Sequence, residues 1–238
     1  MEITPLGDCA VLVRLTGNFE ADPESALEKV LTAQKTLAAA KIPGVIELAP
    51  AYTTVALFYD PIRAIEAGAP VEDIFSWFEQ RIGDAISNAK NASAHSIPST
   101  TVEIPVCYAS EFAFDLDDVA RRTDLEPNEV IALHSSTEYR VHCVGFTPGF
   151  PFLGGLPPKL AAPRRETPRT EIPAGSVGIG GKQTGIYPVK SPGGWNIIGR
   201  TPLRLFDPQR NPPVLVRAGD GVRFRPISRE EFDQLAKS

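Results

Sequence analysis

The first half of the chain alternates between strand-like and helix-like patterns. Apolar and polar positions alternate over residues 2–16, with a break at Gly7 and Asp8, and again over residues 45–48 and 53–59. Between these pairs, apolar residues recur at helical spacing after Asp22 and Pro23, a combination that favours a helix start. A second helical stripe covers residues 71–86. The pattern predicts the order ββαββα, an α+β domain in which two helices cover one face of a four-stranded antiparallel sheet.

A short polar segment follows the second helical stripe. Residues 88–100 are small, polar and without periodicity, as is typical of a domain boundary. We therefore expect an α+β domain over residues 1–92 and a second domain over residues 98–238. His95 lies in this segment, where an exposed linker histidine is a simpler interpretation than a metal ligand.

The second half begins with a strand pattern at residues 101–107 and two short helix patterns at 115–122 and 127–134. Asp115 occupies the cap position of the first of these helices. After a strand at 138–144, short strand patterns separated by glycine or proline recur at 176–179, 185–189, 195–199, 214–216 and 222–226. This spacing predicts a small closed β-barrel rather than a parallel sheet. Ser228 and Glu231 form the capping-box pattern of a final helix.

Composition narrows the class of protein. The 238 residues are 42% hydrophobic and carry a formal charge of −5, which argues against nonspecific nucleic-acid binding. No apolar run approaches the length of a membrane span, and residues 1–15 lack the pattern of a secretory signal. Cys9, Cys107 and Cys143 are widely spaced among apolar residues, so we expect reduced core thiols in a cytoplasmic protein and no zinc site.

One stretch departs from this acidic average. Residues 145–201 hold twelve of the 19 glycines, and seven lysines and arginines against two glutamates. Glycine at this density indicates tight turns or close backbone approach, and the local charge favours a small anion as ligand. Arg164, Arg165 and Arg169 belong to this stretch. A guanidinium group can hold a carboxylate or phosphate in a bidentate manner, although solvent-exposed arginines are the alternative for at least two of the three.

The densest glycine motif lies at residues 173–181. Its backbone N–H groups could point into one concavity and form a cradle for a carboxylate, phosphate or oxyanion. The residues of this candidate anion site are Gly175, Ser176, Val177, Gly178, Gly180 and Gly181. The alternative, a barrel strand whose tight corners need glycine, is equally consistent with the motif. It has neither the Gly-Lys-Ser/Thr of a nucleotide-binding P-loop nor a dinucleotide fingerprint.

Three polar side chains are candidates for catalysis. Gln183 could donate to and accept from an amide-like substrate. Tyr187 could donate a proton or could be a packed aromatic residue. His134 lies near the predicted end of a helix, where the helix dipole raises the pKa of a histidine, so it could act as a general acid or base or simply cap the helix.

Two turn-rich segments supply candidate walls of a binding site. Residues 145–157 contain aromatic residues, including Phe150, and no charge, as suits an apolar pocket wall or a docking loop for a partner protein. Residues 191–195 form a tight-turn pattern from Ser191 to Trp195, whose indole could stack on a ring or close the barrel end.

These motifs together resemble a known family. GFTPGFPFLGGLP, PRRETPRTEIPAGSVGIGGKQTGIYP and SPGGWNIIGRTP, with LHSSTEYRV, LFDP and RAGDGVRFRPIS, are similar to motifs of the 5-oxoprolinase B-subunit family. The same family carries the labels allophanate hydrolase subunit 1 and Kip-type inhibitor of a sporulation histidine kinase. The resemblance is strong over residues 100–227 and loose in the first half. The positions that match the family's motifs are His134, Phe150, Arg169, Gly175, Ser176, Gly178, Gln183, Tyr187, Ser191 and Trp195.

The resemblance implies a cyclophilin-like barrel behind the α+β domain, and a homologous C subunit and a separate A subunit as partners. It also implies an ATP-dependent opening of 5-oxo-L-proline to L-glutamate, in which ATP serves the complex and binding by this chain is left open. Under this hypothesis residues 175–181 hold the anion, and Arg169 binds the carboxylate or phosphate as a clamp. Gln183 recognises the ring amide by hydrogen bonds, and His134 is the general acid or base.

Two alternatives stay open from the sequence. The first is a protein that inhibits a histidine kinase by docking through its Phe- and Pro-rich loop. The second is a carboxyltransferase-type module of a urea carboxylase or allophanate hydrolase system. The chain lacks a biotin-attachment Met-Lys, so any biotin of such a module would be carried by a partner.

Overall fold

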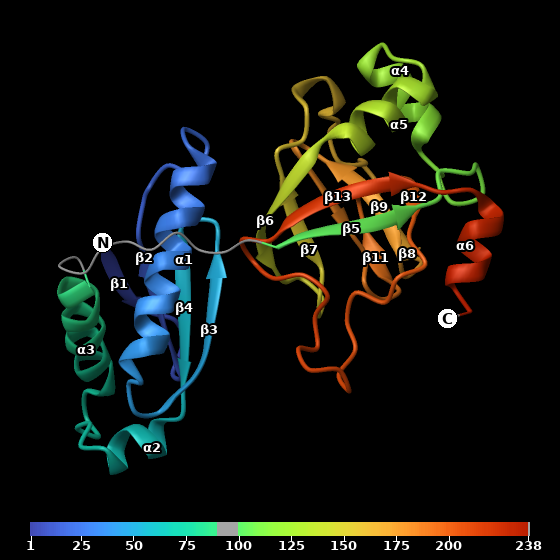
Figure 1. Ribbon diagram of the computed structural model, residues 1–238. Helices are drawn as coiled ribbons and strands as arrows, with labels where there is room; N and C mark the ends of the chain where they lie inside the picture. The colour runs from blue at the N-terminus through green and yellow to red at the C-terminus, as the bar shows by residue number, and fades with distance from the viewer. Residues whose placement is uncertain (90–99, 238) are drawn as a thin grey trace. The chain divides into compact units, whose positions relative to one another are not determined.

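The computed structural model describes residues 1–89 and 100–237 and divides into two compact units, Met1–Pro98 and Ser99–Ser238. Figure 1 shows the elements of each unit. Most of the predicted linker, with His95, lies outside the described residues. Within the described ranges no helix combines the length and the apolar character needed to cross a membrane.

The first unit has the predicted order of elements with one addition. Its elements are β1 (Glu2–Pro5), β2 (Ala10–Arg14), α1 (Pro23–Ala40), β3 (Val45–Ala51), β4 (Thr54–Tyr59), α2 (Pro61–Glu66) and α3 (Ile74–Ala89). The strands form the antiparallel order β1-β2-β4-β3, which confirms the predicted sheet. Asp22 caps α1 by accepting from Ser25 N at 3.0 Å. The short α2 was not predicted.

Apolar residues of α1 and α3 pack with those of β2 and β4 in one core, which includes Leu37, Leu57 and Phe78. This packing explains the helical stripes in the sequence, because each stripe is the buried face of its helix.

The second unit contains most of the short strands. Its elements are β5 (Thr101–Val106), α4 (Leu116–Thr123), α5 (Pro127–Ser136), β6 (Glu138–Val144), β7 (Pro151–Gly154), η1 (Pro158–Leu160), β8 (Arg169–Ile172), β9 (Ser176–Gly180), β10 (Gln183–Ile186), β11 (Ser191–Gly193), β12 (Asn196–Arg200), β13 (Gly221–Pro226) and α6 (Arg229–Leu235).

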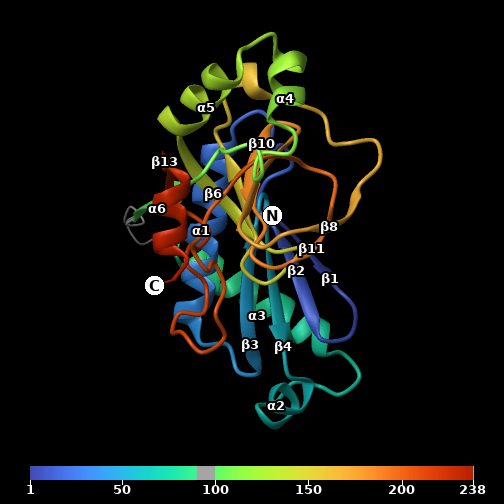
Figure 2. The same ribbon diagram turned by 90° about the vertical axis from the view of Figure 1, so that its right-hand side faces the viewer.

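These strands form a sheet that returns on itself. β6, β7, β10, β9 and β12 are antiparallel neighbours in that order, and β13 pairs with β6 on one side and, in parallel, with β5 on the other. Two backbone hydrogen bonds between Cys107 and Arg200, of 2.8 and 2.9 Å, then join the end of β5 to β12. β8 and β11 form a separate two-stranded sheet beside the larger one (Figure 2).

Three local predictions differ from the structure. β7, β8 and β11 are strands that the sequence pattern did not predict, since each has only three or four residues. The predicted strand at residues 214–216 is wrong, because only Val214 pairs, through one isolated bridge to Phe206. Cys107 and Cys143 are buried thiols as expected, but Cys9 is exposed at the turn before β2, so the prediction of a core thiol is wrong there.

Candidate functional site

The second unit contains a pocket of about 210 Å³ that combines aromatic rings with cations. Its walls come from the segment before β7, the segment before β8 and the turn between β11 and β12. The lining residues are Phe146, Phe150, Phe152, Arg164, Arg165, Pro168, Tyr187, Gly193, Gly194 and Trp195. It therefore brings together Phe150, Tyr187 and Trp195, three of the residues predicted from the sequence.

These three aromatic side chains form the floor of the pocket. The ring of Phe150 makes edge-to-face contacts with those of Tyr187 and Trp195, at centroid distances of 5.1 and 5.4 Å. All three are at most 4% exposed. Edge-to-face packing of this kind fixes the ring planes, so the floor has a defined shape.

Glycine is needed where the backbone passes under these rings. A Cβ at Gly180 would lie 2.6 Å from the indole of Trp195, and one at Gly193 would overlap the phenol of Tyr187. Contacts this close exclude any side chain. Gly180 and Gly193 thus make room for the aromatic floor.

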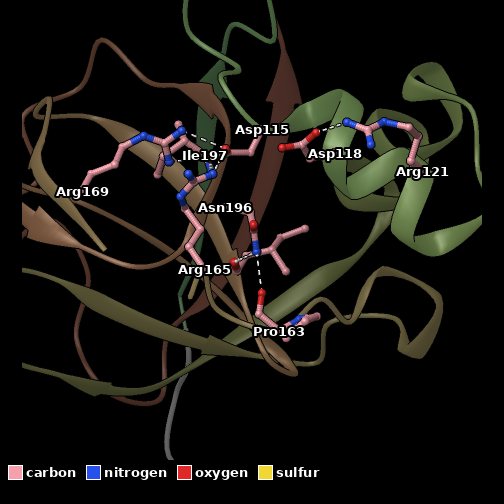
Figure 3. Close-up of polar contacts among 9 residues, drawn as sticks. Asp115, Asp118, Arg121, Pro163, Arg165, Arg169, Asn196 and Ile197 are labelled. Atoms are coloured by element: carbon pink, nitrogen blue, oxygen red, sulfur yellow. Dashed lines mark hydrogen bonds and ion pairs between the residues drawn. The ribbon is translucent and has the colours of Figure 1, made fainter. Parts of the chain in front are cut away.

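A buried carboxylate organises two of the three arginines. Asp115 is 1% exposed, and its oxygens accept from Arg169 Nη1 and Nη2, both at 2.8 Å, and from Arg165 Nη1 at 2.7 Å. Figure 3 shows both guanidinium groups converging on Asp115. The backbone N–H of Ile197 also donates to this carboxylate, at 2.7 Å. The hydrogen bond to Asp115 raises the pKa of Arg169, which is therefore a permanent cation.

This network corrects one prediction. Asp115 occupies the N-cap position of α4, as expected, but its side chain makes no capping hydrogen bond. The carboxylate instead points to residues 50 and 54 positions further along the chain. The sequence pattern therefore placed Asp115 correctly and misjudged what its side chain binds.

The segment that carries Arg164 and Arg165 is held at both sides. The amide of Asn196 donates to Pro163 O at 2.9 Å and to Ile179 O at 3.1 Å, and the backbone N–H of Arg165 donates to Gly194 O at 2.7 Å. Because the main chain is fixed on either side of Arg164, its side chain emerges from a defined point beside the pocket. Sequence reasoning had no local signal for this arrangement.

The charges around the pocket favour an anion. Arg164 and Arg165 line the pocket, and the ion pairs of Arg165 add Asp115 and, through it, Arg169, so these four groups carry a net charge of +2. Burial raises the pKa of Tyr187, whereas a hydrogen bond from the backbone of Trp195 and the charges of Arg164 and Arg169 oppose that rise. Its hydroxyl is therefore protonated at neutral pH and available as a hydrogen-bond donor.

The predicted backbone cradle is not formed. Residues 176–180 are the central strand β9, which pairs with β10 on one side and β12 on the other. At the ends of the motif, Gly175 N donates to Tyr187 O and Gly181 N donates to Ala162 O, each at 2.7 Å. These N–H groups are used within the sheet, so the barrel-strand alternative describes this segment.

His134 lies in the core instead of at the pocket. It is fully buried, and its ring stacks on Phe224 at 4.5 Å. Thr184 Oγ1 donates to Gly178 O and so accepts from His134 Nε2 at 3.0 Å, which leaves Nδ1 to accept from the Tyr108 hydroxyl at 2.9 Å.

Burial lowers the pKa of His134 to about 3, the opposite of the rise predicted from the helix end. Loss of solvation outweighs the helix dipole here, because a full charge in an apolar interior is far more costly than an exposed dipole interaction is favourable. Both ring nitrogens are occupied, so the geometry gives His134 a structural role.

Three further predicted residues, Arg169, Gln183 and Ser191, do not line the pocket. Gln183 is the first residue of β10, opposite Gly180 and partly buried. Ser191 lies in β11 opposite Ile172, and its buried hydroxyl has no hydrogen-bond partner among the described residues.

Comparison with known proteins places this chain in a family. The chain matches the family described as the carboxyltransferase domain, subdomain C and D, over residues 1–216. More specifically, it is 44% identical over 236 residues to the B subunit of 5-oxoprolinase from Bacillus subtilis, with 97% of this chain and 95% of the relative covered. The chain belongs to the 5-oxoprolinase B-subunit family.

Solved structures share the fold of this chain. The crystal structure of TTHA0988 superposes with a TM-score of 0.74 at 36% identity and covers 92% of this chain; the chain spans 40% of that protein. The Kluyveromyces lactis urea carboxylase superposes with a TM-score of 0.76 over 99% of this chain and 22% of that one. At 20% identity, the second likeness shows a shared fold.

Proposed function

We propose that the chain is the B subunit of an ATP-dependent 5-oxoprolinase, which acts with the A and C subunits of the same system. The reaction hydrolyses the ring amide of 5-oxo-L-proline to give L-glutamate and consumes ATP. The observation that carries the proposal is 44% identity to a 5-oxoprolinase B subunit across nearly the full length of both chains. The cyclophilin-like form of the barrel and a cytoplasmic location are retained as parts of this proposal.

The aromatic pocket is the proposed substrate site. Its volume of about 210 Å³ is below the roughly 300–1,000 Å³ that is usual for drug-sized ligands, so it suits a small acid and not a nucleotide. A five-membered lactam ring can lie against Phe150 and Trp195, and the Tyr187 hydroxyl can donate to its carbonyl oxygen. A nucleotide does not fit this pocket, so in this proposal ATP binds outside it.

The roles of the remaining predicted residues follow from their positions. Arg169 supports the site through its ion pair with Asp115, while Gln183 and Ser191 stay predictions as substrate contacts. His134 and the backbone of residues 175–181 are left out of the proposed chemistry, since their polar groups are bonded within the protein. The chemistry of ring opening therefore requires groups from a partner protein in addition to this pocket.

The test is reconstitution. Co-expression of the chain with the proteins encoded beside it, followed by purification, should give a complex that releases glutamate from 5-oxoproline only when ATP is present. Omission of this chain should abolish the release. A purified complex that leaves 5-oxoproline intact but carboxylates urea, or a chain that blocks autophosphorylation of a histidine kinase, would replace this proposal with one of the two alternatives.

A further inference from the structure

The three arginines at residues 164–169 differ in what they already bind. Arg165 and Arg169 share the carboxylate of Asp115. Arg164 forms no ion pair with any carboxylate of the described residues, although it is exposed and lines the pocket. Its guanidinium carbon lies 5.9 Å from the centroid of the Trp195 ring, which belongs to the aromatic floor of the same pocket.

We propose that Arg164 binds the carboxylate of the substrate and thereby selects anionic lactams over neutral ones. The inference rests on the proposed function for the identity of the ligand. It assigns the anion contact to Arg164 in place of Arg169, the clamp expected from the sequence.

The positions of the neighbouring groups support this assignment. The main chain is fixed on both sides of Arg164, by Asn196 at Pro163 and by Gly194 at Arg165, so only the side chain has to be ordered when a ligand arrives. Its charge also reaches the pocket interior, since it opposes the burial-driven rise in the pKa of Tyr187. A cation held in this way binds a planar carboxylate in a bidentate manner.

Asp115 has a complementary role in this arrangement. It neutralises one of the two cations that it binds, and it keeps both guanidinium groups from competing with Arg164 for the ligand.

Binding can be measured without turnover. Trp77 and Trp195 are the two tryptophans of the chain, so Trp77→Phe leaves Trp195 as the only indole of this protein. In the complex with the C subunit, Trp195 fluorescence is titrated with 5-oxo-L-proline, with 2-pyrrolidinone, which has the same ring without the carboxylate, and with inorganic phosphate. Tryptophans of the C subunit are constant across all variants, so differences between variants report the pocket.

Arg164→Ala should weaken binding of 5-oxoproline by about 10- to 100-fold, the loss expected for a charge-assisted hydrogen-bonded contact. Arg164→Lys keeps the positive charge but not the planar guanidinium group with its paired donors, so it should lose less affinity for 5-oxoproline. Binding of 2-pyrrolidinone should not change in either variant. Arg122→Ala, which removes an exposed arginine of α4 outside the pocket, should bind both ligands as the parent does.

The outcomes separate this inference from the proposed function. Unchanged affinity for 5-oxoproline in Arg164→Ala, or equal losses for 5-oxoproline and 2-pyrrolidinone, would overturn the carboxylate contact even if the full complex releases glutamate. Absence of any 5-oxoproline binding to the parent complex would overturn it too. Carboxylate-selective loss in a complex without glutamate release would keep the contact and reject the enzyme. Phosphate binding tighter than 5-oxoproline binding would show that the site takes a phosphate instead.

Discussion

Asp115 and Arg169 form a two-point ion pair in which both guanidinium nitrogens lie 2.8 Å from the carboxylate oxygens of a residue that is 1% exposed. Asp115→Asn should lower the free energy of unfolding by about 3 kcal/mol, as expected when a buried ion pair loses one partner. The cost arises because Arg169 and Arg165 keep their charges beside an amide that cannot neutralise them. Urea unfolding followed by circular dichroism measures the difference.

Asp118→Asn is the matched control for this experiment. Asp118 lies three residues further on, on α4, where it pairs with the exposed Arg121 (Figure 3). Exposed pairs contribute at most about 1 kcal/mol. Equal destabilisation by the two substitutions would show that the Asp115 network contributes no more to the free energy of unfolding than an exposed ion pair does.

The same pair shows what the sequence could and could not predict. An aspartate before a helical stripe indicates a cap, and that placement is right, because caps are defined by neighbouring residues. The arginines that Asp115 binds come 50 and 54 residues later, and their proximity depends on how β8 and β12 are placed in the barrel. No local pattern contains that information.

The glycine motif shows a different limit of prediction from sequence. Glycine at positions 178 and 180 is equally consistent with exposed N–H groups and with a strand covered by aromatic rings, because both arrangements require close approach to the backbone. Helices and strands of the first unit were predictable, since each has a long periodic stripe. The three- and four-residue strands of the second unit are too short to show a period.

His134 should be neutral across the physiological pH range. Burial lowers its pKa from the ordinary value of 6.5 to about 3. Between these values the unfolded chain binds a proton that the folded chain does not. The contribution to stability is therefore complete above pH 6.5 and decreases as the pH falls toward 3, by about 1.4 kcal/mol per pH unit.

Two measurements check this behaviour. The NMR resonances of the His134 ring should show no titration between pH 8 and pH 5, with the proton on Nε2. The free energy of unfolding of His134→Gln should depend less on pH than that of the parent between pH 6 and pH 4, with the slope reduced by about 1.4 kcal/mol per unit. A ring that titrates near pH 6.5 contradicts the buried position and would restore His134 as a candidate acid or base.

Gly180→Ala should disturb the pocket floor. The added methyl would lie 2.6 Å from the Trp195 indole, so the ring must move, and overpacking of this kind costs about 1–3 kcal/mol. We expect lower stability, a changed Trp195 emission spectrum and weaker binding of 5-oxoproline. Gly145→Ala is the control, because a Cβ there meets nothing within 4 Å. If Gly180→Ala binds 5-oxoproline with parental affinity, the indole position is not needed for the site.

The position of the segment before β8 should depend on the side-chain amide of Asn196. Asn196 is buried, and its side chain donates to both Pro163 O and Ile179 O, so Asn196→Leu removes both of these hydrogen bonds while keeping a similar volume. We expect a loss of about 1–3 kcal/mol in unfolding free energy. We also expect faster hydrogen exchange at the Arg165 N–H, which donates to Gly194 O, and weaker 5-oxoproline binding because Arg164 is less fixed.

Gln34→Leu provides the comparison for this last variant, since Gln34 also donates from its amide to a main-chain oxygen, that of Leu48 at 3.2 Å, but in the first unit. That substitution should leave exchange at Arg165 and binding of 5-oxoproline as in the parent. If Asn196→Leu loses stability while the Arg165 N–H keeps its parental rate of hydrogen exchange, Asn196 stabilises the barrel without positioning Arg164. In that outcome, contacts other than the Asn196 amide fix the main chain at Pro163.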